Sequence, residues 1–275
     1  MKLIVESGAS KSNWITIMDQ TILDRQKHAG INLTSNPYSI EVLNTVDFIN
    51  NKDIKEIYFY GAGLSALSAK KRLSEKLAGM FENASVEIQT DILAAARAVS
   101  HKSESIVSIL GTGMNCVVFN GAEIVHQSRS LGYLISDDGS GFNIGRLIIK
   151  AYFQKTMPEK DSLEFEKQYN IHERDLIVDI YKSSKPNYLI AQISKFLNHS
   201  SRVFRTSILE ENFDAFFKNQ ILPLNKYNNF KLTFVGSIAE TFQNELLLIA
   251  KKYGRGINKI IKDPIEGLIE YHKQN

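Results

Sequence analysis

Small and hydroxyl-bearing residues in the middle of the chain form a pattern that suits phosphate binding. An apolar run, Ile106–Leu110, stops at Gly111-Thr112-Gly113, and a second apolar run, Cys116–Phe119, follows and ends at Asn120-Gly121, a dipeptide preferred in type I′ hairpin turns. The two glycines let the backbone approach a ligand and expose N–H groups, and the threonine hydroxyl adds a donor suited to a phosphate oxygen. A plain hairpin with a tight turn explains the same residues equally well.

Asp91 stands where a general base could act. The segment Ser85–Asp91 alternates apolar and polar residues, which predicts a strand, and the alanine-rich segment Ile92–Ala98 predicts a helix directly after it. The carboxylate would then lie at a strand carboxyl end and at a helix N-terminus, where α/β sheets place ligands. Aspartate is also a frequent N-cap residue, so helix capping is the competing explanation.

A glycine-rich segment with two adjacent carboxylates, Ser136-Asp137-Asp138-Gly139-Ser140-Gly141, precedes another predicted helix. Its spacing differs from that of an EF-hand calcium loop, so we discount calcium. The carboxylates could hydrogen-bond the hydroxyl groups of a ligand, and a structural turn is the alternative. Asn32, in a polar loop ending at Pro37, could likewise present its amide to a polyol or serve a turn.

The composition is that of an ordinary globular chain of 275 residues with 43% hydrophobic content, and the expected location is the cytoplasm. No apolar stretch approaches the roughly 18 residues of a membrane span. The single cysteine, Cys116, cannot form an internal disulfide and is expected to be buried and structural. The net charge of +3 is too small to indicate nucleic-acid binding, and six scattered histidines argue against a zinc site.

The predicted elements repeat once along the chain. The first copy begins with a predicted strand over Lys2–Val5, followed by a hydroxyl-rich turn and a second strand over Asn13–Met18. A hairpin then leads into a third strand over Thr21–His28. The same order of strand, turn, strand, hairpin and strand recurs about 100 residues later. A duplicated unit suggests two similar lobes, residues 1–104 and 105–275, with a cleft between them suited to a nucleotide.

The remaining segments complete this α/β arrangement. A last central strand, Leu232–Val235, ends at Gly236-Ser237 before a predicted helix, and such a turn could carry adenosine or a phosphate. Neither a Walker P-loop nor a dinucleotide fingerprint is present. The pattern of residues 145–220 predicts helices, and we find no motif of a catalytic or binding site in this region. Further helices are expected over about 40–50, 65–80 and 238–252 and from Pro264, with an edge strand over 257–261.

In this order, the motifs resemble those of the N-acetylglucosamine kinase-like branch of the superfamily of sugar kinases, heat-shock chaperones and actin, grouped with the BadF/BadG/BcrA/BcrD-type ATPases. The resemblance covers most of the chain and implies an α/β, two-lobed actin-like ATPase fold of duplicated ribonuclease H-like domains with a nucleotide cleft between the lobes. Glu6–Trp14 is similar to the family's first phosphate motif, and Gly111–Asn115 is similar to its second. Ser136–Gly141 resembles the family's Gly-Asp-Glu-Gly-Ser-Gly segment. Val235–Ser237 resembles the adenosine motif, and Thr90-Asp91 resembles the catalytic-base segment.

The resemblance implies an ATP-dependent kinase that phosphorylates an amino sugar such as N-acetylglucosamine at the 6-hydroxyl. Asp91 would accept the hydroxyl proton, and Glu6, where many relatives carry aspartate, would hold Mg²⁺ through water. The nucleotide would be bound by Gly8, Ser10, Lys11, Gly111, Thr112, Gly113, Gly236 and Ser237, and the sugar by Asn32, Asn115 and Asp137.

The sequence departs from the family pattern at some of these positions, and other functions stay open. Ser7, Ala9 and Ser10 replace a richer set of glycines and a threonine, which also fits a catalytically inert sugar or nucleotide sensor. Ser136 and Asp138 replace the usual glycine and glutamate, which leaves N-acetylglucosamine, glucosamine, N-acetylmuramic acid and glucose as candidate sugars.

A BadF-type ATPase that activates a partner enzyme by electron transfer is the first alternative to the kinase, and the sensor is the second. Its shared iron–sulfur cluster needs two thiolates per subunit, and this chain has one cysteine. The expected partner is a small-molecule sugar rather than nucleic acid or a membrane, with a homodimer as a candidate assembly.

Overall fold

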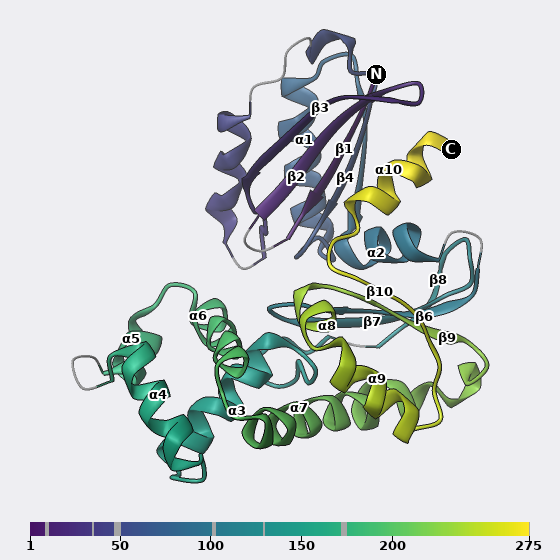
Figure 1. Cartoon of the computed structure of the whole chain (residues 1–275). Coiled ribbons are helices and arrows are strands. Elements are labelled where there is room, and N and C mark those ends of the chain that lie inside the picture. The colour runs from purple at the N-terminus through teal and green to yellow at the C-terminus, as the bar shows by residue number, and fades with distance from the viewer. Residues whose placement is uncertain are drawn as a thin grey trace. The chain divides into compact units, whose positions relative to one another are not determined.

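The computed structural model describes residues 1–8, 11–34, 36–46, 51–100, 103–128, 130–171 and 175–274. The chain divides into two compact units. The first comprises Met1–Ser103 and Pro264–Asn275, and the second comprises Glu104–Asp263. Each unit contains one five-stranded mixed sheet with helices packed on it (Figure 1).

The sheet of the first unit has the order β3-β2-β1-β4-β5. β1, β2 and β3 form an antiparallel meander, and β4 and β5 run parallel to β1. The elements are β1 (Lys2–Ser7), β2 (Lys11–Met18), β3 (Thr21–Ala29), β4 (Glu56–Gly61), β5 (Ser85–Thr90), α1 (Leu67–Met80), α2 (Asp91–Val99), α10 (Ile265–Gln274) and 3-10 helices at Pro37–Thr45 and Asn51–Asp53.

Alternation along the strands separates two faces of this sheet. Leu3, Val5 and Phe59 are fully buried in one hydrophobic cluster with Leu73 and Leu77 of α1. Residues on the other face of β1 and β4 lie under α2 and α10, which also pack on each other. The parallel register pairs Ser7 with Gly61 and Gly61 with Thr90, so the segments after β1, β4 and β5 leave the sheet at one edge.

The sheet of the second unit has the order β10-β9-β6-β7-β8, which repeats the first sheet strand for strand. β6, β7 and β8 form the antiparallel meander, and β9 and β10 run parallel to β6. The strands are β6 (Ser105–Leu110), β7 (Met114–Phe119), β8 (Ile124–Gln127), β9 (Lys231–Val235) and β10 (Ile257–Ile261). The predicted α/β duplication, with β10 at an edge, is therefore confirmed.

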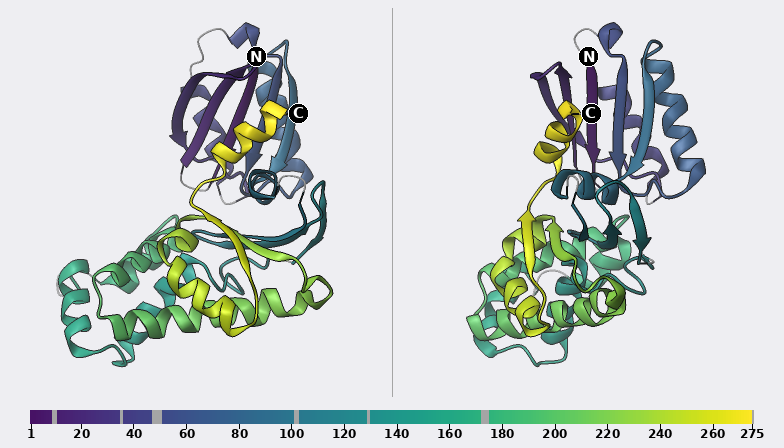
Figure 2. Two further views of the ribbon diagram at one scale, coloured as in Figure 1. Left: turned by 45° about the vertical axis from the view of Figure 1, so that its right-hand side comes forward. Right: turned by 90° about the vertical axis from the view of Figure 1, so that its right-hand side faces the viewer.

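Most helices of the second unit lie between β8 and β9 in the chain. Figure 2 shows α3, α7 and α9 on one face of the second sheet, where Leu110, Val118 and Phe234 join Phe213 and Leu246 in one core. The helical elements are α3 (Gly141–Phe153), α4 (Glu159–Tyr169), α5 (Leu176–Lys182), α6 (Pro186–Ile193), α7 (Arg202–Phe216), α8 (Ser237–Thr241), α9 (Gln243–Lys252), 3-10 helices at Ser194–Asn198 and Leu222–Tyr227, and a π-helix at Phe217–Ile221. Within the described parts of the chain, no helix is long and apolar enough to span a bilayer.

Three local predictions are wrong. The helix expected over 40–50 is a 3-10 helix that starts earlier, at Pro37, because the Asn36 side chain caps the Tyr38 N–H; residues 47–50 lie outside the described ones. The helix expected over 238–252 is two helices, because the buried Phe242 leaves the helical region at φ −113° and ψ 32°. The hairpin after β7 has a four-residue loop, because Asn120 Oδ1 accepts the N–H groups of Ala122 and Glu123.

The terminal helix α10 belongs to the first unit, although the sequence places it in the second lobe. It packs on α2 and β1, and Gly267 lies so close to α2 that a Cβ there would be 2.3 Å from the Ala98 carbonyl oxygen. No local pattern in residues 264–274 indicates this long-range packing.

Candidate active site

Asp91 begins α2 at the edge where β5 ends. The N-cap is Thr90, whose Oγ1 accepts the Leu93 N–H at 3.4 Å, so the capping role considered for Asp91 is wrong. Asp91 is partly exposed, and its Oδ1 accepts the Ile92 N–H at 2.8 Å. Burial raises the pKa of the Asp91 carboxyl, and its contacts with backbone N–H groups oppose that shift. A raised pKa makes a carboxylate a stronger proton acceptor near neutral pH.

The turn between β1 and β2 is closed by a hydrogen bond from the Gly8 N–H to the Lys11 carbonyl oxygen at 3.0 Å. Ser10 lies outside the described residues. Glu6, two residues before Gly8, accepts a hydrogen bond from Asn13 Nδ2 at 3.0 Å. Ser7, which departs from the family pattern, is fully buried and exchanges hydrogen bonds with the backbone of Ile31. It therefore ties the end of β1 to the segment that carries Asn32.

Asn32 packs against the loop that follows β4. Gly63 has φ +72°, and a Cβ there would lie 2.1 Å from Asn32 Oδ1. Thr34 Oγ1 donates to the Gly63 carbonyl oxygen at 2.7 Å, and the Asn32 N–H donates to Ser39 Oγ at 3.0 Å. The first unit thus holds Asn32 against a loop at the sheet edge from which Asp91 also emerges.

In the second unit, the turn Gly111–Gly113 is bonded to the start of α3. The Gly111 carbonyl oxygen accepts the Gly141 N–H at 2.8 Å, and the Thr112 carbonyl oxygen accepts the Phe142 N–H at 3.1 Å. These bonds join the second phosphate-type turn to the glycine-rich segment before α3. The bonds also satisfy two of the backbone N–H groups in the first turn of α3, which would otherwise lack a partner in the helix.

Asp137 is a buried carboxylate of the second unit. It is 5% exposed, sits at φ +78°, and its Oδ2 would contact a Cβ on Gly113 at 2.8 Å. Its Oδ1 is buried and accepts no hydrogen bond from the residues that the structure describes. Burial, reinforced by the neighbouring charge of Asp138 and opposed by the Met114 N–H, raises the pKa of Asp137 to about 6. A buried acceptor of this kind calls for a donor such as a ligand hydroxyl.

Asn115, the third residue considered for the sugar, has its amide oxygen engaged along the sheet. Asn115 Oδ1 accepts the Cys116 N–H at 3.0 Å and a longer bond from Gln127 Nε2 at 3.4 Å. Cys116 is 1% exposed, and burial raises the pKa of its thiol to about 11, so the expectation of a buried structural cysteine is confirmed.

A cavity of about 450 Å³ in the second unit brings three sequence motifs together. Gly111 and Thr112, Gly141, and Ser237 all line it. Gly236 lies behind this wall at φ +124°, where a Cβ would be 2.3 Å from the Leu110 carbonyl oxygen, so only glycine fits there. The rest of the lining is Ala191, Gln192, Ser194, Lys195, Asn198, His199, Ile238, Thr241, Phe242 and Lys262.

The sequence missed the polar wall formed by Gln192, Lys195, Asn198 and His199. These residues come from the end of α6, from the 3-10 helix after it and from the C-cap of that helix, His199, within the region where no site signal was found. They form no glycine turn or spaced motif, and only the packing of α6 against α3 places them on the cavity. Pro186 at the start of α6 was the one local signal, and it indicates a helix start only.

The buried Asp137 predicts a pH-dependent stability. Its folded-state pKa is raised from 3.8 to about 6, so the folded protein holds this proton more tightly than the unfolded chain. The contribution of Asp137 to the free energy of unfolding therefore falls as the pH rises from about 4 to 6, by up to about 3 kcal/mol. We expect Asp137→Asn to gain stability relative to the wild type over this range, measured by urea unfolding at pH 4.5 and 7.5. A stability difference that is the same at both pH values contradicts the shift.

Comparison with solved structures finds the same fold in two proteins described as sugar kinases. A proposed N-acetylglucosamine kinase from Porphyromonas gingivalis has a solved structure that matches 100% of this chain and 99% of its own, with a TM-score of 0.93 and 32% sequence identity. A proposed N-acetylglucosamine kinase from Chromobacterium violaceum matches 98% of both chains with a TM-score of 0.74, but at 12% identity it supports the fold alone.

A curated relative matches over a shorter range. The N-acetylmuramic acid/N-acetylglucosamine kinase of Clostridium acetobutylicum is 38% identical over 104 residues, which are 35% of this chain and 33% of that protein. No family model matches the sequence. Because the Porphyromonas gingivalis protein is similar over its full length, the chain belongs to the N-acetylglucosamine kinase-like family of actin-fold sugar kinases.

Proposed function

We propose that this protein is a cytoplasmic ATP-dependent kinase that phosphorylates an N-acetylated amino sugar, such as N-acetylglucosamine, at the 6-hydroxyl. One observation carries the proposal: Gly111, Thr112, Gly141 and Ser237 converge on a single cavity in a chain that matches a proposed N-acetylglucosamine kinase from end to end. The cavity is lined by the hydroxyl-bearing residues Thr112 and Ser237 and by the lysines Lys195 and Lys262, a lining suited to a nucleotide.

The nucleotide phosphates would be bound by two turns of the same design. In the first unit these are Gly8, Ser10 and Lys11, and in the second Gly111, Thr112 and Gly113. Ser237 would contact the adenosine, and Gly236 would let the backbone of β9 approach the turn after β6. Binding of this kind positions the γ-phosphoryl group and neutralises its charge, which is most of what phosphoryl transfer requires.

Asp91 would act as general base. It would take the proton of the sugar 6-hydroxyl while that oxygen forms a bond to the γ-phosphorus of ATP. The bond between the γ-phosphorus and the oxygen that bridges it to the β-phosphorus breaks, and ADP leaves. The raised pKa of Asp91 suits this task. Asn32, Asn115 and Asp137 would hold the sugar, with the unpaired Oδ1 of Asp137 accepting from a sugar hydroxyl.

The residues present fit a magnesium ion bound mainly by phosphate. Among the described residues, no group of three or more His, Cys, Asp or Glu side chains could hold a metal by itself. Mg²⁺ keeps several waters and commonly takes one or two carboxylates together with substrate phosphates, so the single carboxylate of Glu6 is sufficient. When bound, the ion neutralises charge on the phosphates, and Glu6, oriented by Asn13, would hold one of its waters.

An ADP-release assay with Mg-ATP tests the proposal. We expect release that depends on N-acetylglucosamine or N-acetylmuramic acid and is weaker with glucosamine and glucose. Controls without sugar report the intrinsic ATPase rate. Folded protein that binds ATP but releases no ADP with any of the four sugars contradicts the kinase and supports the sensor. Sugar-independent release would instead favour a partner-activating ATPase, although the buried Cys116 is poorly suited to ligate a cluster.

A further inference from the structure

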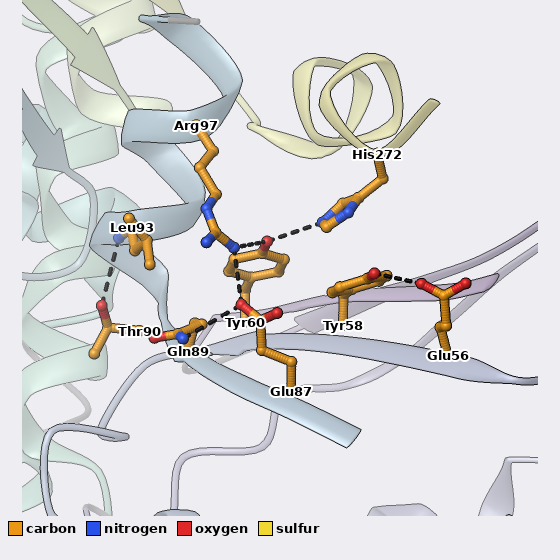
Figure 3. A network of polar contacts seen from close by, with 9 residues as sticks. All are labelled: Glu56, Tyr58, Tyr60, Glu87, Gln89, Thr90, Leu93, Arg97 and His272. Atoms are coloured by element: carbon orange, nitrogen blue, oxygen red, sulfur yellow. Dashed lines mark hydrogen bonds and ion pairs between the residues drawn. The ribbon is translucent and has the colours of Figure 1, made fainter. Parts of the chain in front are cut away.

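A polar network inside the first unit connects three elements that are distant in the sequence. Figure 3 shows Arg97 of α2, Tyr60 of β4 and His272 of α10 meeting at the Tyr60 hydroxyl. Arg97 Nη1 donates to Tyr60 Oη at 2.6 Å and to Glu87 Oε1 at 3.1 Å, and Tyr60 Oη lies 2.9 Å from His272 Nε2. We call Arg97, Tyr60 and His272 the clamp.

The hydrogen bonds of the clamp run in one direction. Arginine has only donors, so Tyr60 Oη accepts from Arg97 and gives its own proton to His272 Nε2. Burial raises the pKa of Tyr60 to about 12, so the phenol keeps that proton. Burial and the charges of Arg97 and Lys2 lower the pKa of His272 to about 3, so the imidazole is neutral and its Nε2 can accept.

Ring contacts add to this clamp. The Arg97 guanidinium lies 5.6 Å from the Tyr60 ring centroid and 5.1 Å from that of Tyr271. The Tyr58 ring stacks on His272 with centroids 4.0 Å apart. His272 is 3% exposed, so α10 is anchored in the core of the first unit. The second half of α2 is thus held by the sheet on one side and by α10 on the other.

The same helix begins with Asp91. α2 has nine residues, and Arg97 lies about 9 Å along the helix axis from Asp91 at 1.5 Å per residue. A helix this short moves as one body, so a tilt at Arg97 displaces Asp91. Tyr60 also pairs with Glu6 on β1 and with Gln89 on β5, and paired residues in a sheet point to the same face. Arg97 of the clamp therefore lies on the helix that begins with the proposed base, Asp91, and Tyr60 of the clamp is the strand partner of Glu6, the proposed magnesium residue.

We propose that Arg97, Tyr60 and His272 are positioning residues that fix α2 so that Asp91 can take the proton of the sugar hydroxyl. This inference rests on the proposed role of Asp91. Displacements of about 1 Å in a catalytic group cost up to about 100-fold in rate, so a modest loosening of α2 is measurable.

Tyr60→Phe is the sharpest test, because it removes the hydroxyl shared by Arg97 and His272 and keeps the ring. Tyr58→Phe is the matched control: it removes a hydroxyl from the same strand and face, where Tyr58 bonds Glu56 outside the clamp. We expect Tyr60→Phe to lower kcat about tenfold, with KM for ATP and for sugar within about twofold, and Tyr58→Phe to stay near wild type. Arg97→Lys should retain more activity than Arg97→Met. Equal kcat values for Tyr60→Phe and Tyr58→Phe overturn the inference.

Amide hydrogen exchange of residues 91–99 provides a second readout that needs no activity. We expect faster exchange in this segment in Tyr60→Phe than in Tyr58→Phe, while exchange in α1 is the same in both. If the wild type shows no sugar-dependent ADP release, the proposed function fails, and exchange alone decides whether the clamp restrains α2. Exchange that does not differ between the two variants contradicts the restraint.

Discussion

Asp91→Asn is expected to lower kcat for sugar phosphorylation at least about 100-fold while nucleotide affinity stays near that of the wild type. The amide is nearly the size of the carboxylate and can still accept the Ile92 N–H, and Thr90 still caps α2, so the fold should persist. What the variant loses is the ability to accept a proton. Turnover is measured by coupled ADP release and nucleotide affinity by isothermal titration calorimetry.

Asp19→Asn is a suitable control for Asp91→Asn. Asp19 is exposed in the turn between β2 and β3 at φ +52°, a conformation that asparagine also accepts, so this variant should match the wild type in both measurements. Near-normal turnover of Asp91→Asn would refute the assignment of the base. A fall in nucleotide affinity that accounts for the whole loss would indicate a binding role instead.

Gly145→Ala is expected to lower the free energy of unfolding by about 2–3 kcal/mol. Gly145 lies in α3 where α6 crosses it, and a Cβ there would be 1.9 Å from the Ile190 carbonyl oxygen and 2.8 Å from its carbon. The obstacle is backbone, so α6 must move as a whole. This cost exceeds the gain of up to about 1 kcal/mol that alanine brings to a helix. Urea denaturation measures the change.

Gly79→Ala is the control for Gly145→Ala. Gly79 is also helical, near the end of α1, and no described atom lies within 4 Å of a Cβ placed there. This variant should be as stable as the wild type or slightly more so. Because α6 carries Gln192 to the cavity wall, Gly145→Ala should also weaken nucleotide binding, which Gly79→Ala should not do. Equal stability of the two variants would show that α3 and α6 separate at little cost.

The parts of the fold that the sequence predicted are those with local causes. Alternating strands end in small residues at Gly111 and Gly236, and these turns need glycine for close backbone approach, so strand ends and candidate ligand turns could be located together. Asp91 was placed at its strand end for the same reason. Its capping role was wrongly considered because the threonine immediately before it is also a favoured cap residue, and the extended backbone at Thr90 decides between them.

The parts that the sequence missed depend on packing between distant segments. Gln192 and Lys195 reach the cavity only because Gly145 lets α6 approach α3, and no residue near position 192 encodes that. The same holds for α10, whose His272 is an unremarkable histidine in the sequence and a buried hydrogen-bond partner of Tyr60 in the structure.

The return of α10 to the first unit also has a consequence for the order in which the protein acquires its structure. During synthesis, all five strands of the first sheet leave the ribosome before residue 104, but α10, which covers one face of the sheet together with α2, follows only after residues 104–263. Until then Tyr60 and Arg97 lack His272, and the face under α10 is open to water or to a chaperone. Maturation of the N-terminal sheet therefore waits for the second unit, so ribosome-bound chains stalled after Asp263 should remain sensitive to protease within residues 91–99.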